Sequence, residues 1–305
     1  MLTLTHFENL TDQTQGTWIN TIDPTPEEKQ QLLTQTGIPE DFLTYGLDPD
    51  EGGRYEYDDD SSTGLVIFDA PVAQDDPDLP TYTTVPLTVI MTGNGFVTMI
   101  DDQNILTKIQ AMLAQPTNAN AVLLQILYDL SRNYLPPLRA INKERITLAR
   151  RLQSDLRNRD LYAMMGIQQS LVYFKLSLKT NRDVLTNLKQ ANALNFDDDA
   201  IDQLDDILIE TQQATEMTEI TDAILHETTD TYNAVINNNL NDVMKVLTLY
   251  SIVLTIPGIV FGFFGMNVHF PFTQDHWGWL ITIGIAILLS ALIAVRLNHR
   301  QFFRK

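Results

Sequence analysis

The sequence predicts an α+β cytosolic domain with long helices, followed by two C-terminal transmembrane helices. Short strand-like runs separated by turn residues fill roughly the first hundred positions. A long segment almost free of proline and glycine follows, and the chain then ends in two apolar runs. Runs of that length suit the hydrocarbon core of a bilayer, whereas the interrupted N-terminal pattern suits a compact domain.

Composition limits the classes of function. The 305 residues carry a formal net charge of -19 and include no cysteine. An acidic surface repels nucleic acid and attracts cations, so nucleic acid is not an expected partner. Without cysteine, the available metal ligands are oxygen atoms and a few histidines, which suit hard cations such as Mg²⁺.

Residues 1–130 are predicted to form a cytosolic α/β domain. Strand-like runs lie at residues 16–22, 54–57, 64–70, 82–92 and 96–100. Asn94-Gly95 supplies a hairpin turn before the last run, and the Thr-Pro-Glu-Glu sequence at residues 25–28 predicts a capped helix start. The first twenty residues contain no lysine or arginine, so no secretory signal is expected.

Residues 131–245 are predicted to be helical, because Gly166 is the only glycine and no proline occurs between Pro137 and Pro257. Two antiparallel helices with charged, solvated faces are expected between Arg132 and Lys189, with a break near residues 157–160. The acidic run at residues 195–199 favours the start of another helix. Uninterrupted to residue 266, this acidic stalk helix would be about 100 Å long and would have to pack against copies of itself or other helices.

The two apolar runs are predicted to span a membrane, at residues 246–267 and 277–296. A loop at residues 268–276 joins them, and a basic tail follows at residues 297–305. Lysine and arginine flank both ends of the pair but are absent from the loop, so both termini are expected on the cytoplasmic side of the cell membrane. The alternative is a buried hairpin of two core helices.

One face of the first span is small and weakly polar. Its residues recur every three or four positions: Thr248, Ser251, Thr255, Gly258, Gly262 and Gly265. From periodicity, two interpretations stay open. The face either packs closely against another helix, or it lines a pore in which small side chains leave a lumen and hydroxyls tolerate water.

The first span ends in Gly265-Met266-Asn267, which resembles the Gly-Met-Asn signature of the CorA family of divalent-cation transporters. The Asn-Asp-Val-Met-Lys-Val-Leu-Thr sequence at residues 241–248 is similar to the family's approach to this helix, and residues 18–25 and 38–43 resemble its cytosolic domain. The resemblance implies a homopentamer in the lipid bilayer. It also implies influx of Mg²⁺, with Co²⁺ or Zn²⁺ as other candidate ions, driven by the membrane potential and gated by intracellular Mg²⁺.

The resemblance further implies roles for individual residues. Asn267 would form a ring at the outer mouth that contacts the hydrated ion, and Met244 and Leu247 would form an apolar gate. The pore-facing set would be Asn241, Met244, Leu247, Thr248, Ser251, Thr255, Gly258 and Gly262. Asp206, with Asp205 beside it, would bind regulatory Mg²⁺, although a solvated acidic face is at least as good an interpretation for any one carboxylate there.

An enzyme is not expected, because the chain has no phosphate-binding glycine loop, no His-Glu-x-x-His pair and no cysteine nucleophile. His269 and His276 could flank a metal ion, but structural or solvated histidines are favoured. The loop lacks the Met-Pro-Glu-Leu sequence common in the family, so ion recruitment is expected to differ. A zinc transporter of the same superfamily and a non-conducting, membrane-anchored oligomeric scaffold are the competing hypotheses.

Overall fold

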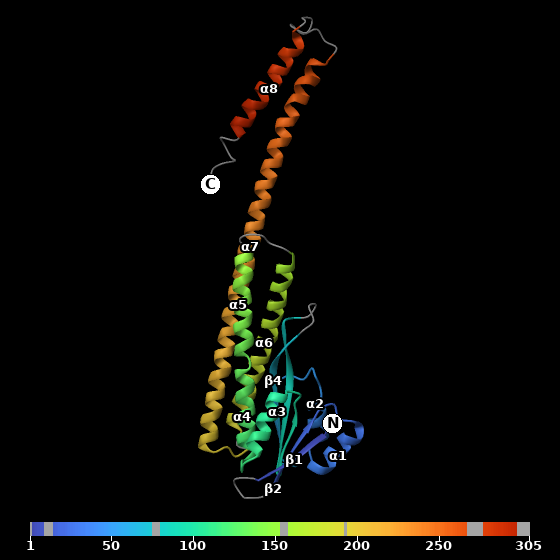
Figure 1. Cartoon of the computed structure of the whole chain (residues 1–305), viewed down its shortest axis with the longest axis vertical. Helices are drawn as coiled ribbons and strands as arrows, with labels where there is room; N and C mark the ends of the chain where they lie inside the picture. The colour runs from blue at the N-terminus through green and yellow to red at the C-terminus, as the bar shows by residue number, and fades with distance from the viewer. Residues whose placement is uncertain are drawn as a thin grey trace. The chain divides into compact units, whose positions relative to one another are not determined.

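The computed structural model describes residues 2–8, 15–74, 80–152, 158–191, 194–266 and 277–297. The chain divides into two compact units, residues 1–228 and 229–305, and the division falls within one long helix, α7. Each unit is described separately below. Figure 1 shows the order of the elements along the chain.

The first unit contains a sheet whose six described strands follow the order β1-β2-β6-β5-β4-β3. All neighbours are antiparallel except β2 and β6, which run parallel. The strand bounds are β1 Leu2–Glu8, β2 Gln15–Thr21, β3 Arg54–Asp58, β4 Thr63–Ala73, β5 Tyr82–Thr92 and β6 Gly95–Met99. The five predicted strands are therefore confirmed, and β1 is an additional edge strand.

A hairpin turn joins β5 and β6 as predicted, but it lies at residues 93–94, one residue before the predicted Asn94-Gly95, and Gly95 is the first residue of β6. Gly95 has a φ of +148°, and a Cβ built on it would lie 1.9 Å from the carbonyl oxygen of Thr17 in β2. Only glycine lets the backbone of β6 approach β2 this closely. Gly95 is thus needed for the parallel pairing of β6 with β2.

Helices α1 (Pro26–Thr36) and α2 (Glu40–Gly46) cover one face of the sheet. The predicted capping box is present: Glu28 N donates to Thr25 Oγ1 at 3.3 Å, and Thr25 N donates to Glu28 Oε2 at 2.9 Å. Leu32 and Phe42 pack here against Leu65 of β4. One local sequence motif therefore fixes the start of the first covering layer.

The other face of the sheet is covered by α3 (Gln103–Leu113), α4 (Ala119–Arg132), α6 (Asn158–Gln190) and the start of α7 (Asp198–Phe264). Side chains along β4 alternate between the two faces, so Val66 and Phe68 join this second core whereas Leu65 and Ile67 join the first. The first unit is consequently built of three layers, with the sheet in the middle (Figure 1).

Beyond the sheet, α5 (Leu135–Leu152), α6 and α7 pack around a further core. Ile141, Phe174 and Ala214, one from each helix, are fully buried in it. The predicted pair of helices is confirmed: α5 ends at Leu152 and α6 begins at Asn158. Residues 158–160, which belong to the predicted break, are helical. The predicted long helix is also confirmed, because α7 contains 67 residues without interruption.

A buried polar group ties β4 to α6. Tyr134 Oη and Asn181 Nδ2 each donate to the carbonyl oxygen of Asp69 at 2.9 Å, and Asp69 N donates to Asn181 Oδ1 at 2.8 Å. Burial raises the pKa of the Asp69 carboxyl group. Burial, and after it the charge of Asp69, raise the pKa of Tyr134 well above its ordinary value. These residues serve the fold, because every contact fixes one element against another.

Candidate cation pathway

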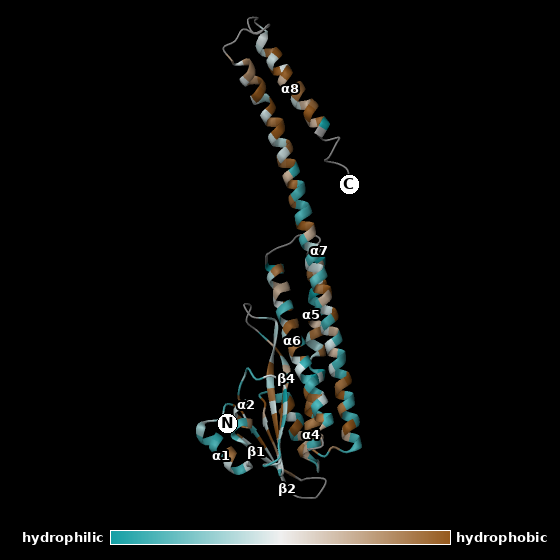
Figure 2. Ribbon diagram, turned by 180° about the vertical axis from the view of Figure 1, so that it is seen from behind, coloured by the Kyte–Doolittle hydropathy of each residue, from teal (hydrophilic) through white to brown (hydrophobic). Residues whose placement is uncertain are grey.

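The second unit holds the end of α7 and α8 (Gly278–Leu297), and both are long and apolar enough to span a membrane. In Figure 2 the ribbon of both segments is coloured mostly as hydrophobic residues. Only 11% of the most apolar window of each helix is buried inside the protein. A core hairpin would be mostly buried, so the exposure favours membrane-spanning helices over the alternative of a buried hairpin.

Around this part of α7, three faces differ in character. Ile256 and Val260 are buried against Ala286 of α8, with Ile252 and Ile293 packed beside them. A second face is exposed and bulky and contains Tyr250, Leu254 and Phe261. The third face is the predicted small stripe, which α8 does not cover: Thr248, Ser251, Thr255, Gly258 and Gly262 are all exposed.

The two glycines of the small stripe also show that α8 does not cover it. A Cβ added to Gly258 or Gly262 would meet nothing within 4 Å. Packing of the stripe against α8 of the same chain is therefore excluded. The stripe faces open space within one copy, so its neighbour is a pore lumen, a second copy or lipid.

The hydroxyl groups of the stripe all point their hydrogens back into the helix. Thr248 Oγ1 donates to the carbonyl of Met244 at 2.7 Å, Ser251 Oγ to Leu247 at 2.9 Å, and Thr255 Oγ1 to Ser251 at 2.7 Å. Each hydroxyl oxygen keeps its lone pairs for an outside donor. The stripe therefore presents a row of hydrogen-bond acceptors and no hydroxyl donors from these three residues.

The predicted gate residues lie on α7 just before the stripe. Met244 and Leu247 are exposed, as is Asn241 one turn earlier. At 100° per residue, Met244 falls on the line of Thr248, Ser251 and Gly258, and Leu247 lies at its edge. A ring of Met244 and Leu247 side chains from several copies would be an apolar constriction at the end of the acceptor row.

At the other end, α7 finishes at Phe264. Gly265 N donates to the carbonyl of Phe261 at 2.8 Å, and Met266 N donates to that of Phe263 at 3.4 Å, which closes the last turn. Asn267 lies outside the described residues, as do His269, His276 and the basic tail beyond residue 297. The structure therefore describes only the first two residues of the Gly-Met-Asn sequence.

Pro257 is a feature of the pathway that the sequence reasoning did not assign. It lies inside α7, where its missing N–H removes the hydrogen bond that the carbonyl of Val253 would otherwise accept. The sequence could have indicated it, because a proline followed directly by glycine, here Gly258, marks a weakened turn in a long helix.

The two carboxylates predicted to bind regulatory Mg²⁺ lie on α7 in the first unit. Asp205 forms an ion pair with Lys189 at the end of α6, whereas Asp206 is exposed on an adjacent face. Among the described residues, no group of three histidine, aspartate or glutamate side chains is close enough to hold a metal ion.

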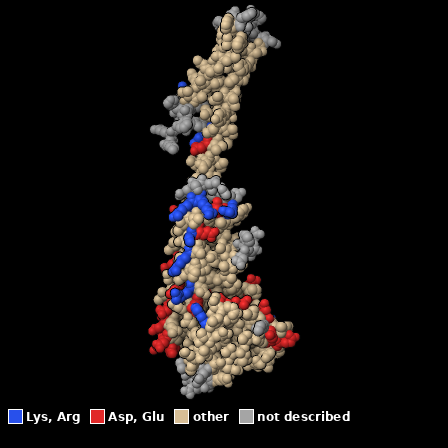
Figure 3. Space-filling view, in the orientation of Figure 1, with Lys and Arg blue, Asp and Glu red and all other residues tan. Residues whose placement is uncertain are grey.

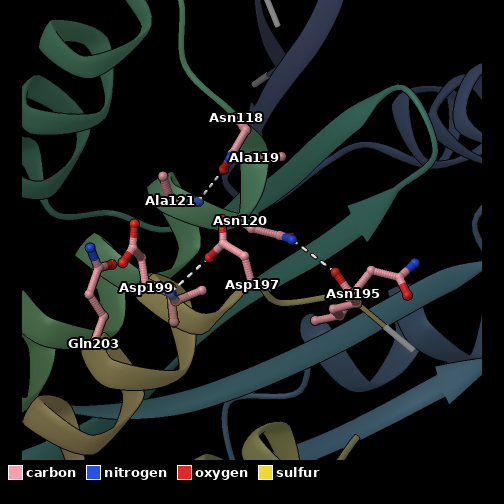
Figure 4. A pocket seen from close by; sticks show the side chains of 11 residues that line it. Asn118, Ala119, Asn120, Ala121, Asn195, Asp197, Asp199 and Gln203 are labelled. Atoms are coloured by element: carbon pink, nitrogen blue, oxygen red, sulfur yellow. Dashed lines mark hydrogen bonds between the residues drawn. The ribbon is translucent and has the colours of Figure 1, made fainter. Parts of the chain in front are cut away.

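A polar pocket at the start of α7 is explained by helix capping (Figure 4). Asn118 Oδ1 accepts from Ala121 N at 2.6 Å at the start of α4, and Asp197 Oδ1 accepts from Ala200 N at 2.8 Å at the start of α7. Asn120 Nδ2 donates to the carbonyl of Leu194 at 2.9 Å. The pocket joins two helix N-termini, and its polar groups are used by them.

Comparisons with known proteins cover almost the whole chain. A profile of the CorA-like Mg²⁺ transporter protein family matches residues 13–300. The cobalt/magnesium transport protein CorA of Methanocaldococcus jannaschii is 25% identical over 288 residues, which cover 91% of this chain and 89% of that protein.

Solved structures agree with the fold. The complete structure of the CorA magnesium transporter from Methanocaldococcus jannaschii matches with a TM-score of 0.81 and 24% identity, covering 95% of this chain and 92% of that one. The full-length CmaX protein matches with a TM-score of 0.73 and 17% identity, covering 93% and 89% of the two chains. These similarities confirm the predicted fold class.

Proposed function

The chain belongs to the CorA-like Mg²⁺ transporter protein family, and on this premise we propose that it forms a homopentameric channel for Mg²⁺ and Co²⁺ lined by α7. Independently of this proposal, the chain is a divalent-cation transporter in a membrane and is not an enzyme. The relative from Methanocaldococcus jannaschii is named a cobalt/magnesium transport protein, which supports the choice of ions.

The observation that carries the proposal is the exposed acceptor row of Thr248, Ser251 and Thr255. Mg²⁺ gives up its water reluctantly, and the water molecules around a cation point their hydrogens outward. Such a hydrated ion needs acceptors on the wall around it, and it needs room. Hydroxyl oxygens with their hydrogens turned away supply the acceptors, and Gly258 and Gly262 supply the room.

Asn267 is proposed to form the outer ring that selects the hydrated ion. Its amide oxygen is a neutral acceptor, which contacts the water shell without holding the ion as strongly as a carboxylate would. At the inner end, Met244 and Leu247 are proposed to close the channel by excluding water from an apolar ring. Transport needs no ATP in this scheme, because a doubly charged ion gains about 4.6 kcal/mol across 100 mV.

Asp206 is proposed to bind intracellular Mg²⁺ between two copies and so to favour the closed channel. The pairing of Asp205 with Lys189 supports Asp206 as the leading ligand. A ligand that binds the closed state more tightly shifts the population toward it.

Both termini are proposed to lie in the cytoplasm of a cell whose plasma or inner membrane holds the channel. Lys245 precedes the first span and Arg296 ends the second, while Trp277 and Trp279 stand exposed at the start of α8. Basic residues on the inner side and aromatic residues at the interface support this orientation.

Cation uptake into proteoliposomes tests the proposed function. The purified chain should take up Mg²⁺ and Co²⁺ when the inside is negative, and Asn267→Ala should lose most of this uptake while still assembling. Uptake of Zn²⁺ in preference to both ions would instead support a zinc transporter. No uptake of any of the three ions from a correctly assembled protein would support a non-conducting scaffold.

Magnesium sensitivity tests the regulatory part separately. The Asp206→Asn variant should conduct at internal Mg²⁺ concentrations that close the wild type, and protease protection of the cytosolic domain by Mg²⁺ should weaken. Asp205→Asn is the matched control variant. Its effect on Mg²⁺ sensitivity should be smaller because Asp205 pairs with Lys189. If the Asp206→Asn variant stays as sensitive as the wild type, Asp206 is not the sensor.

A further inference from the structure

Helix α6 carries an exposed apolar stripe. Tyr162, Met165, Val172 and Leu176 recur at helical spacing and are 71%, 54%, 61% and 63% exposed. The opposite side of α6 packs on the sheet and on α5. A row of apolar side chains in a unit with an acidic, water-exposed surface indicates a contact surface.

Helix α7 carries a second exposed stripe within the same unit. Ile209, Ile220 and Ile224 share one face and are 65%, 61% and 37% exposed, and the exposed Gln213 and Glu216 lie between the first two on that face. At 1.5 Å per residue, the α6 stripe is about 21 Å long and the α7 stripe is about 22 Å long. The two stripes therefore match in length.

The charges on the two helices favour contact between an α6 stripe and an α7 stripe over contact between two α7 stripes. Helix α6 contains five basic residues and two acidic ones, whereas residues 198–228 of α7 contain ten acidic residues and no lysine or arginine. Figure 3 shows basic side chains gathered along the α5–α6 pair and acidic side chains at the start of α7. Contact between two α7 stripes would bring like charges within the Debye length of about 8 Å, whereas contact between α6 and α7 brings opposite charges together.

We propose that the α6 stripe of one copy docks antiparallel on the α7 stripe of the next copy, with Leu176 opposite Ile209 and Met165 opposite Ile220. The direction rests on the proposed function, because copies arranged around a pore lined by α7 keep all α7 helices parallel. Consecutive helices α6 and α7 run in opposite directions, so α6 of one copy is antiparallel to α7 of its neighbour. Two different surfaces on each copy form a head-to-tail contact that closes into a ring.

Thiol cross-linking tests the contact, because the chain contains no cysteine of its own. Two differently tagged copies of the full chain, one with Leu176→Cys and one with Ile209→Cys, are expressed together and treated with a short bismaleimide. The expected product is a dimer that carries both tags. In the matched control, Ile224→Cys replaces Ile209→Cys, and this position is about 22 Å away along the same stripe; little mixed product is expected.

Two results would overturn the contact. One is a same-tag dimer formed by Leu176→Cys alone, since it would place α6 against α6. The other is the absence of mixed-tag product from protein that still sizes as an oligomer. A second variant avoids dependence on thiol geometry: Leu176→Glu should lose the oligomer in detergent, whereas Ile146→Glu on α5, outside both stripes, should keep it.

Cation uptake by the same preparations separates this inference from the proposed function. Uptake that persists without the mixed-tag product overturns the α6–α7 contact and leaves the channel intact. The mixed-tag product in wild-type-like protein that conducts no ion supports the contact and overturns the channel.

Discussion

Thr255→Val removes one acceptor from the row that is proposed to face the hydrated ion, while keeping the shape of the side chain. The lost oxygen is the one whose hydrogen is bonded to the carbonyl of Ser251 at 2.7 Å, so it faces the stripe only as an acceptor. A hydrogen bond contributes about 0.5–1.5 kcal/mol net. We take the water shell of one ion to bond with the Thr255 hydroxyl of two copies at a time. A loss of about 0.7 kcal/mol for each of these two hydrogen bonds adds to about 1.4 kcal/mol, which predicts about tenfold slower uptake.

The assay is initial Mg²⁺ uptake into proteoliposomes at a fixed membrane potential, with oligomer content measured in the same preparation. Thr282→Val is the matched control, because Thr282 Oγ1 on α8 makes the same kind of bond, to the carbonyl of Gly278 at 3.0 Å, outside the stripe. Thr255→Ser keeps the hydroxyl and should keep most of the uptake. Equal uptake by Thr255→Val and the wild type, or an equal fall in Thr282→Val, would refute the reasoning.

Three further outcomes are expected. Leu247→Asn should raise Mg²⁺ uptake at high internal Mg²⁺, because a polar ring lets water into the closed gate; unchanged uptake by the variant would argue against a gate at Leu247. Asn181→Ala should lower the unfolding free energy of the first unit by about 2 kcal/mol or more, and Tyr134→Phe should lower it by about 1 kcal/mol, since only the first substitution leaves the Asp69 N–H without an acceptor. Denaturation curves giving the reverse order would contradict this. The raised pKa of Asp69 means that the wild type loses stability relative to Asp69→Asn as pH rises from about 3.8 through the folded-state pKa, and a difference that does not vary with pH would contradict it.

Much of the first unit could be predicted because its signals are local. The capping box at Thr25, the hairpin turn before Gly95 and the alternation along β4 each depend on a few adjacent residues. Strand β1 was missed although Leu2-Thr3-Leu4-Thr5 alternates, because an edge strand at a chain end has no flanking turn signal on one side. The pairing of β2 with β6 could not be predicted, since parallel neighbours far apart in the sequence leave no local mark.

The candidate pathway shows a similar limit. Helical spacing predicts that Thr248, Ser251 and Thr255 share a face, but it does not say which face meets α8. The structure settles this through Ile256, Val260 and Ala286, and it shows that the bulky half of α7 is itself divided between a packed face and an exposed one. Which part of the bulky half of α7 is packed depends on α8, a helix that comes later in the chain.

Accessibility of cysteines along α7 tests the assignment of the pore face most directly, since the chain has no other thiol. Single cysteines replace Ser251, Thr255 or Gly258 on the small stripe and Leu254 or Phe261 on the exposed bulky face, and Mg²⁺ uptake is measured before and after a charged, water-soluble thiol reagent. The pore assignment predicts that the reagent blocks uptake at the three stripe positions and leaves it unchanged at the two bulky ones. Block at Leu254 and Phe261 with none at the stripe would contradict it.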